Sequence, residues 1–159
     1  MDTREYLQQI KTLHIKIRQR QAEAHELREA AMSIGSPSPD KEKVQSSGVK
    51  DAIAEQVTRY TDMLIEIDFM IWDLSCLKHR IIGEIHQLTD ARYIDILFKR
   101  YVELKTWELI AVEMNYSYDY VKELNAYALE EFHNKVIVPT QSHLNTDYND
   151  NVKEYNEDK

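Results

Sequence analysis

Apolar residues near the start of the chain recur at alternating steps of four and three residues. The series consists of Tyr6, Ile10, Leu13, Ile17, Ala24, Leu27, Ala31 and Ile34. This heptad spacing predicts a helix with one narrow buried stripe. Gly35 is a natural C-terminal cap, and the prolines at positions 37 and 39 prevent continuation, so we expect the helix to end there.

A second heptad series follows residues 35–48, which have the composition of an exposed linker. Its members are Ile53, Val57, Tyr60, Leu64, Ile67, Ile71, Leu74, Leu77, Ile81, Ile85 and Leu88. Neither apolar stripe is stable in water, and the linker is short, so residues 1–88 are expected to form an antiparallel coiled-coil hairpin. The second helix carries more apolar surface than one partner helix covers, at Met63, Phe69, Met70 and Trp72. Packing against the rest of the chain and formation of a homodimer both remain open for this surface.

The apolar rhythm shortens after Thr89. We expect one helix at about residues 91–104, another that begins after Thr106 and another that begins after Ser117, because Thr and Ser are good N-caps. These helices would form a small domain over residues 89–138. Residues 139–159 are rich in Asn, Asp, Thr and Tyr and have little to bury, which is typical of a disordered acidic tail. The predicted fold class is all-α, with a long helical hairpin and a small helical domain.

The composition agrees with this organisation. The chain of 159 residues has only three Gly and three Pro, the residues that are least favourable inside helices. No apolar run approaches the roughly 20 residues needed to span a bilayer, and the N-terminus lacks the apolar core of a secretory signal. With a single cysteine, Cys76, these features indicate a cytoplasmic location and no membrane partner. The net charge of −8 is unfavourable for nucleic-acid binding, although a local basic patch can still act.

Residues 106–121 have the side chains that two short, closely crossing helices require for packing, for the turn between them and for capping. Ala111 is small enough for the inner face of the first helix, and Asn115 tolerates the left-handed backbone that a sharp turn requires. Ser117 can cap the second helix, and Val121 can anchor it to the core. Together these features predict a helix-turn-helix.

The same region resembles the fourth region of bacterial sigma factors. The likeness is carried by residues 93–101 (YIDILFKRY), 106–111 (TWELIA), 114–117 (MNYS), Ala128 and Leu129. Over about residues 4–135 the chain looks more closely like a family of small transcriptional regulators from phages and prophages of Gram-positive bacteria. These proteins share an N-terminal helical hairpin, a linker of the type Val44-Gln-Ser-Ser and a sigma-like helix-turn-helix. The resemblance implies a transcription regulator that binds DNA, host RNA polymerase or both.

By this resemblance, the helix that begins at Ser117 would enter the major groove of DNA. The implied DNA-binding residues are Ser117, Tyr118, Lys122 and Asn125, with Lys105 and Arg100 before them. Relatives tend to carry basic residues near Asp119 and Glu123, whereas this chain has carboxylates there. Residues 89–135 hold nine acidic and six basic side chains. A solvated helix face is an alternative for Lys122 and Asn125, and an ion pair within the domain is an alternative for Arg100.

Catalytic and metal-binding patterns do not emerge from the sequence. Its six histidines show no hydrolase-like pairing with Ser, Cys or carboxylates, and three glycines cannot supply a phosphate-cradling loop. Cys76 and His79 share a helical face, but no second pair with ligand spacing accompanies them. We therefore expect no enzyme activity, no metal and no cofactor. The alternative to a DNA-binding regulator is a protein-interaction module that keeps the helix-turn-helix fold without binding DNA.

Overall fold

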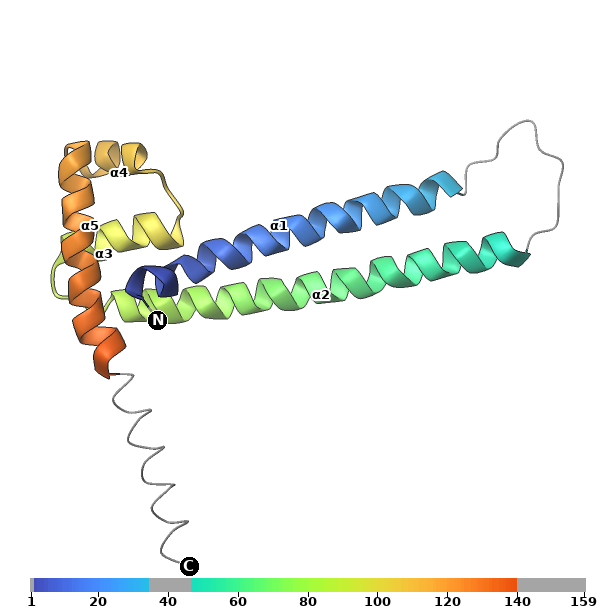
Figure 1. Cartoon of the computed structure of the whole chain (residues 1–159), viewed down its shortest axis with the longest axis horizontal. Coiled ribbons are helices and arrows are strands. Elements are labelled where there is room, and N and C mark those ends of the chain that lie inside the picture. The colour runs from blue at the N-terminus through green and yellow to red at the C-terminus, as the bar shows by residue number, and fades with distance from the viewer. Residues whose placement is uncertain (1, 35–46, 140–159) are drawn as a thin grey trace, which may run out of the picture. The chain divides into compact units, whose positions relative to one another are not determined.

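The structure, a computed structural model, describes residues 2–34 and 47–139 (Figure 1). Its elements are α1 (Thr3–Ile34), α2 (Ser47–Ile85), α3 (Ala91–Leu97), η1 (Phe98–Val102), α4 (Trp107–Met114), α5 (Tyr118–Phe132) and η2 (His133–Ile137), where η1 and η2 are π-helical turns. Because the described residues contain no strand, the all-α prediction is confirmed. Most of the predicted linker at 35–48, and all but the first residue of the predicted tail at 139–159, lie outside the described residues.

The chain divides into two compact units. Residues 12–76 form the first, which we call the hairpin unit. Residues 1–11 and 77–159 form the second, which we call the C-terminal unit. The C-terminal unit therefore includes the first turns of α1 and the last turns of α2, beyond the boundary near residue 89 that the sequence suggested.

Within the hairpin unit, α1 and α2 run side by side in opposite directions (Figure 1). Ile17 and Ala24 of α1 and Ile67 of α2 are buried, with exposed fractions of 6%, 4% and 4%. An ion pair joins the two helices at one edge, where Arg20 Nη2 lies 3.3 Å from Glu66 Oε1. Each helix thus buries a narrow stripe against the other.

The buried stripe of α2 differs in part from the heptad series that the sequence predicted. Val57, Leu64 and Ile71 are 50%, 39% and 44% exposed, so their assignment to the buried seam is wrong. Met63 and Met70 are half-buried instead. The physical reason is that α2 carries overlapping apolar stripes, and one partner helix covers only one of them.

The core of the C-terminal unit is built from every helix that enters it. Its most deeply buried apolar residues are Leu7, Ile10, Ile81, Ile85, Ile96, Leu97, Ile110, Val121, Leu124, Ala128 and Phe132. Within this unit α5 packs against α3 and α4. The first turns of α1 contribute Leu7 and Ile10, and the ring of Tyr6 lies 6.3 Å from that of Phe132. The start of the chain is therefore part of the domain that holds α5.

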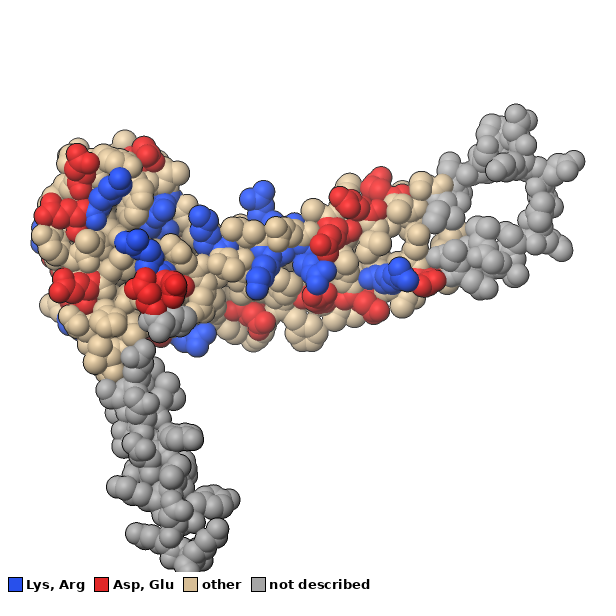
Figure 2. Space-filling view, in the orientation of Figure 1, with Lys and Arg blue, Asp and Glu red and all other residues tan. Residues whose placement is uncertain are grey.

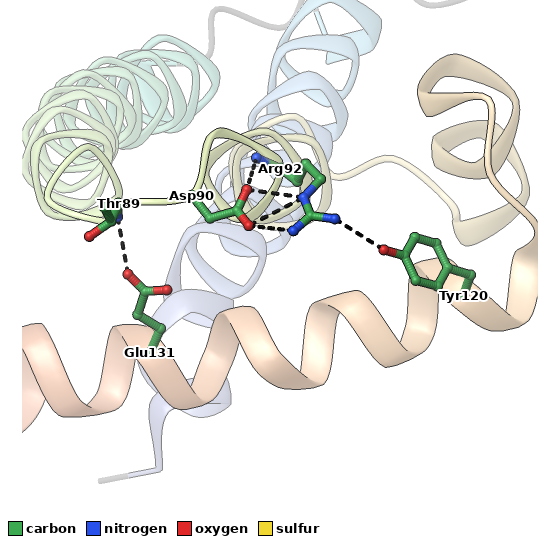
Figure 3. A network of polar contacts seen from close by, with 5 residues as sticks. All are labelled: Thr89, Asp90, Arg92, Tyr120 and Glu131. Atoms are coloured by element: carbon green, nitrogen blue, oxygen red, sulfur yellow. Dashed lines mark hydrogen bonds and ion pairs between the residues drawn. The ribbon is translucent and has the colours of Figure 1, made fainter.

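A polar network at the start of α3 connects it to α5 (Figure 3). Asp90 is the N-cap of α3, and its Oδ1 accepts a 2.8 Å hydrogen bond from the backbone N–H of Arg92. The Arg92 guanidinium pairs with the same carboxylate and donates through Nη1 to the Tyr120 hydroxyl at 3.3 Å. Nearby, the backbone N–H of Thr89 donates to Glu131 Oε1 at 3.0 Å. These contacts fix α5 beside the entry to α3.

Candidate nucleic-acid interface

The candidate interface is the segment formed by α4, a turn at residues 115–117, and α5. The Thr106 hydroxyl accepts from the backbone N–H of Leu109, and the Ser117 hydroxyl accepts from that of Tyr120, so both predicted N-caps are confirmed. Asn115 has φ 57° and ψ 43°, the left-handed conformation that the sequence predicted for it. These local interactions set where α4 ends and where α5 begins.

The outward face of α5 is acidic. Asp119, Glu123 and Glu130 are exposed on it together with Ala126 and Tyr127. The Tyr127 hydroxyl donates to Glu123 Oε1 at 3.0 Å, which raises the pKa of that phenol above its ordinary value. Carboxylates on this face repel the phosphate backbone of DNA. The most exposed surface of α5 therefore presents negative charge where the resemblance implies a contact with DNA.

Most cations of residues 89–135 are neutralised by carboxylates of the same domain. The ion pairs among the described residues are Arg92–Asp90, Lys99–Asp95, Lys99–Glu113, Lys105–Glu103, Lys105–Glu113 and Lys135–Glu131. Figure 2 shows the result as cations and carboxylates intermixed over the region of α3, α4 and α5. On the face that Figure 2 draws, these side chains do not form one continuous basic surface.

Arg100 and Lys122 form no ion pair with a carboxylate among the described residues, and they lie on the same groove. This groove has a volume of about 330 Å³ and is lined by Arg4, Gln8, Arg100, Tyr101, Trp107, Lys122 and Asn125. Arg4 likewise has no ion pair within the described part of the chain. The structure thus gathers three cations at the flank of α5, where it meets η1 and the first turn of α1.

Two aromatic rings support the cations of this groove. The Arg100 guanidinium carbon lies 4.3 Å from the centroid of the Trp107 ring, and Arg100 Nη1 donates to the Lys105 carbonyl oxygen at 2.7 Å. The Lys122 ammonium lies 4.4 Å from the centroid of the Tyr118 ring. Such cation–π contacts restrict the side chains while leaving part of each cation open to a ligand. The intradomain ion pair that the sequence offered for Arg100 is not formed among the described residues.

Glu108 is the carboxylate beside this cluster. Its pKa lies below the ordinary value, first because its own backbone N–H and the Thr106 hydroxyl bond to the carboxylate, and also because Lys122 and Arg100 attract it. The carboxylate therefore remains ionised and opposes an anion in the groove. The three cations of the groove, Arg4, Arg100 and Lys122, still outnumber this one carboxylate.

Asn125 is the clearest correction to the sequence-based site. It was expected on the outward face of α5, but it is only 4% exposed. Its Oδ1 is buried without a hydrogen-bond partner among the described residues. The reason is helical geometry: Asn125 lies four residues after Val121, so the two side chains share the inner face of α5.

The remaining residues that were expected to bind DNA differ in whether another contact already engages their side chains. Tyr118 is 38% exposed and lies under Lys122, so the structure brings these two together. Ser117 is exposed but uses its hydroxyl as the N-cap. The Lys105 ammonium lies 2.9 Å from Glu103 and 2.8 Å from Glu113, so it is not a free phosphate ligand.

Sequence reasoning missed Arg4 as a member of the site. The residue lies far from α5 in the sequence, and only the packing of the first turns of α1 into the C-terminal unit brings it to the groove. One signal was present: the apolar series already begins at Tyr6 and Ile10, in the first turns of α1, and Leu7 adds to it. Because the first turn of α1 is buried in the C-terminal unit, the polar residues of that turn, such as Arg4, also lie in this unit.

The described residues contain no group of three or more His, Cys, Asp or Glu side chains placed to hold a metal ion. Cys76 is exposed as a free thiol. Among the described helices, none is both long enough and apolar enough to cross a membrane. Comparison with protein-family models, with curated proteins and with solved structures gave no significant match.

Proposed function

We propose that this protein is a transcription regulator of phage or prophage type that acts in the cytoplasm without a chemical step. In this proposal α4 and α5 form a helix-turn-helix that contacts DNA, host RNA polymerase or both. The likeness of about residues 4–135 to phage and prophage regulators with a sigma-like helix-turn-helix suggests the biology. The observation that carries the proposal is that α5 is capped, anchored through Val121 and Leu124, and exposed along its outward side.

The charge distribution favours contact with the DNA backbone over direct reading of bases. Arg4, Arg100 and Lys122 lie together at one flank of α5, whereas Asp119 and Glu123 occupy its outward face. Phosphate contacts position a protein on DNA and carry most of its salt-dependent affinity. The helix-turn-helix would then lie with this flank against a strand, and its binding would depend only weakly on sequence.

The acidic face of α5 favours a second candidate, a protein-interaction module. Asp119, Glu123 and Glu130 are exposed, and no cation forms an ion pair with any of them among the described residues. Such a face complements a basic surface on a partner protein, and charge complementarity accelerates and orients association. In this candidate the helix-turn-helix keeps its fold and presents carboxylates to a partner such as the polymerase.

A mobility-shift titration with duplex DNA over a range of salt concentrations separates the two candidates. A backbone-binding protein loses affinity steeply as salt rises, and removal of one phosphate contact in Lys122→Gln should reduce the salt slope by about 1. Asp119→Asn is the matched control, because it also changes one charge on α5 but lies outside the groove. It should strengthen DNA binding slightly by removing repulsion.

Absence of DNA binding together with binding of the polymerase supports the protein-interaction module. If no shift occurs at low salt, the DNA proposal fails. The polymerase is then tested directly, by measuring binding of purified polymerase to the wild-type chain and to Glu123→Gln. Loss of polymerase binding in Glu123→Gln with full binding in Lys122→Gln would assign the acidic face as the contact.

A further inference from the structure

We propose that the groove between the first turn of α1, η1 and α5 is a binding site for a phosphate group. Its ligating side chains are Arg4, Arg100, Lys122 and Asn125. The site does not depend on the proposed function. A phosphate of a nucleic-acid backbone would make it part of the DNA contact, whereas a free phosphorylated molecule would make it a separate ligand site.

The cations of the groove are available for an anion. Within the described ranges 2–34 and 47–139, Arg4 and Lys122 have no ion pair with a carboxylate, and Arg100 is held there by Trp107 and by the Lys105 carbonyl oxygen rather than by an acid. Only Nη1 of Arg100 is used in that hydrogen bond, so its other N–H groups remain for a ligand. Guanidinium and ammonium groups on three elements around one groove are the arrangement that phosphate recognition uses.

Asn125 is the second and independent observation. An amide that is 4% exposed with an unpartnered Oδ1 is unfavourable, and its neighbours on the inner face of α5, Val121 and Ala128, are apolar. A leucine at this position would avoid the unpartnered atom. Since Asn125 lines the groove, its amide N–H groups can donate to an ionised phosphate oxygen, which gives a polar residue a reason to occupy this inner position.

The size of the groove suits this ligand class. Its volume of about 330 Å³ lies near the lower end of small-molecule sites and exceeds the space of a phosphate group alone. An adjoining smaller pocket shares Arg100 and Tyr101 and adds Lys11, a further cation. The groove can therefore hold a phosphate together with part of the molecule or strand to which it is attached.

The two tryptophans of the chain give a direct test. Trp107 lines the groove under Arg100, whereas Trp72 is 68% exposed in the hairpin unit. Trp72→Phe therefore leaves Trp107 as the only tryptophan, and its fluorescence reports on the groove. Titration with inorganic phosphate, with chloride lowered to keep the ionic strength constant, should produce a saturable change in emission. A duplex with 5′-hydroxyl ends is titrated in parallel.

Substitutions in the Trp72→Phe protein assign the response to the groove. Lys122→Gln and Asn125→Leu should each weaken phosphate binding by about tenfold or more, because each removes a hydrogen bond to an anion. Lys16→Gln, the loss of an exposed lysine in the hairpin unit, should leave the affinity unchanged. Without phosphate, Asn125→Leu should melt at a higher temperature, and phosphate should no longer raise that temperature.

The result decides both whether the site exists and what supplies the phosphate. A response to inorganic phosphate indicates a free ligand, and a response to the duplex alone indicates backbone phosphate. Phosphate binding without any DNA binding would leave the site standing while refuting the DNA-binding function. If neither probe changes Trp107 emission, or if Lys122→Gln and Lys16→Gln respond alike, the proposed site is refuted.

Discussion

The guanidinium carbon of Arg100 lies 4.3 Å from the centroid of the Trp107 ring, so a residue of η1 covers the first residue of α4. The same guanidinium donates to the carbonyl oxygen of Lys105 at 2.7 Å. The contact with Trp107 spans the connection at residues 103–106, and the hydrogen bond to Lys105 holds that connection from within. Arg100 therefore has a structural role in addition to any ligand that it binds, and that role has a measurable consequence.

Arg100→Met should destabilise the protein by about 1–2.5 kcal/mol, because it keeps the aliphatic stem but loses the cation–π contact and the hydrogen bond to a backbone carbonyl. Urea unfolding followed by circular dichroism measures the change. Lys122→Met is the matched control, since Lys122 is exposed, contacts the Tyr118 ring and forms no ion pair with a carboxylate in the part of the chain that the structure describes. Equal losses in the two variants would contradict the structural role of Arg100.

Asn115 allows a test of the turn between α4 and α5. At its φ of 57°, a β-carbon without a local hydrogen-bonding group is strained, so Asn115→Ala should destabilise the protein by about 1 kcal/mol. Asn115→Gly removes the strain altogether and should be at least as stable as the wild type. Thermal unfolding of the three proteins compares them. An alanine variant as stable as the glycine variant would mean that the turn adopts another conformation.

The parts of the interface that sequence predicted correctly are local. Thr106 and Ser117 act as caps because their hydroxyls reach backbone N–H groups within one turn, and Asn115 adopts the left-handed conformation for a similarly local reason. The position of Asn125 depends instead on which side of α5 meets the core. The contribution of Arg4 depends on packing between distant parts of the chain, which no local pattern records.

The hairpin unit shows a different limit of prediction. Helix α2 carries apolar residues around much of its circumference, and the heptad rule alone does not decide between the stripe with Leu64 and the stripe with Met63. The structure half-buries Met63 and leaves Leu64 39% exposed. The choice depends on the facing residues of α1, of which Ile17 and Ala24 are buried in the hairpin unit.

Truncation of α2 residues tests this assignment of faces. Ile67→Ala should cost about 2–4 kcal/mol, because the side chain is 4% exposed and its loss leaves a cavity. Phe69→Ala, at a residue 68% exposed, should change stability by no more than about 0.5 kcal/mol. Urea unfolding at several protein concentrations measures both. A large, concentration-dependent loss in Phe69→Ala would instead support the homodimer that the sequence left open.

The hydrogen bond between Tyr6 and Glu84 predicts how stability changes at alkaline pH. The Tyr6 hydroxyl donates to both oxygens of the Glu84 carboxylate, at 2.9 and 2.7 Å. Burial, followed by this hydrogen bond and the negative charge of Glu84, raises the pKa of Tyr6 from 10.0 to about 12, with Arg80 acting in the opposite direction. The folded protein thus holds this proton more tightly than the unfolded chain does.

A group whose pKa is raised on folding contributes stability that is fully present at pH values below its pKa in the unfolded chain. This contribution is lost as the pH rises through its pKa in the folded protein. For Tyr6 that window runs from pH 10.0 to about 12. Because the chain has 10 tyrosines, the measurement is the difference between wild type and Tyr6→Phe in urea unfolding across this window. Tyr6→Phe should lose less stability with rising pH. Glu84→Gln keeps an acceptor without the charge and should fall between them, whereas parallel curves for all three proteins would show that this hydrogen bond does not form in solution.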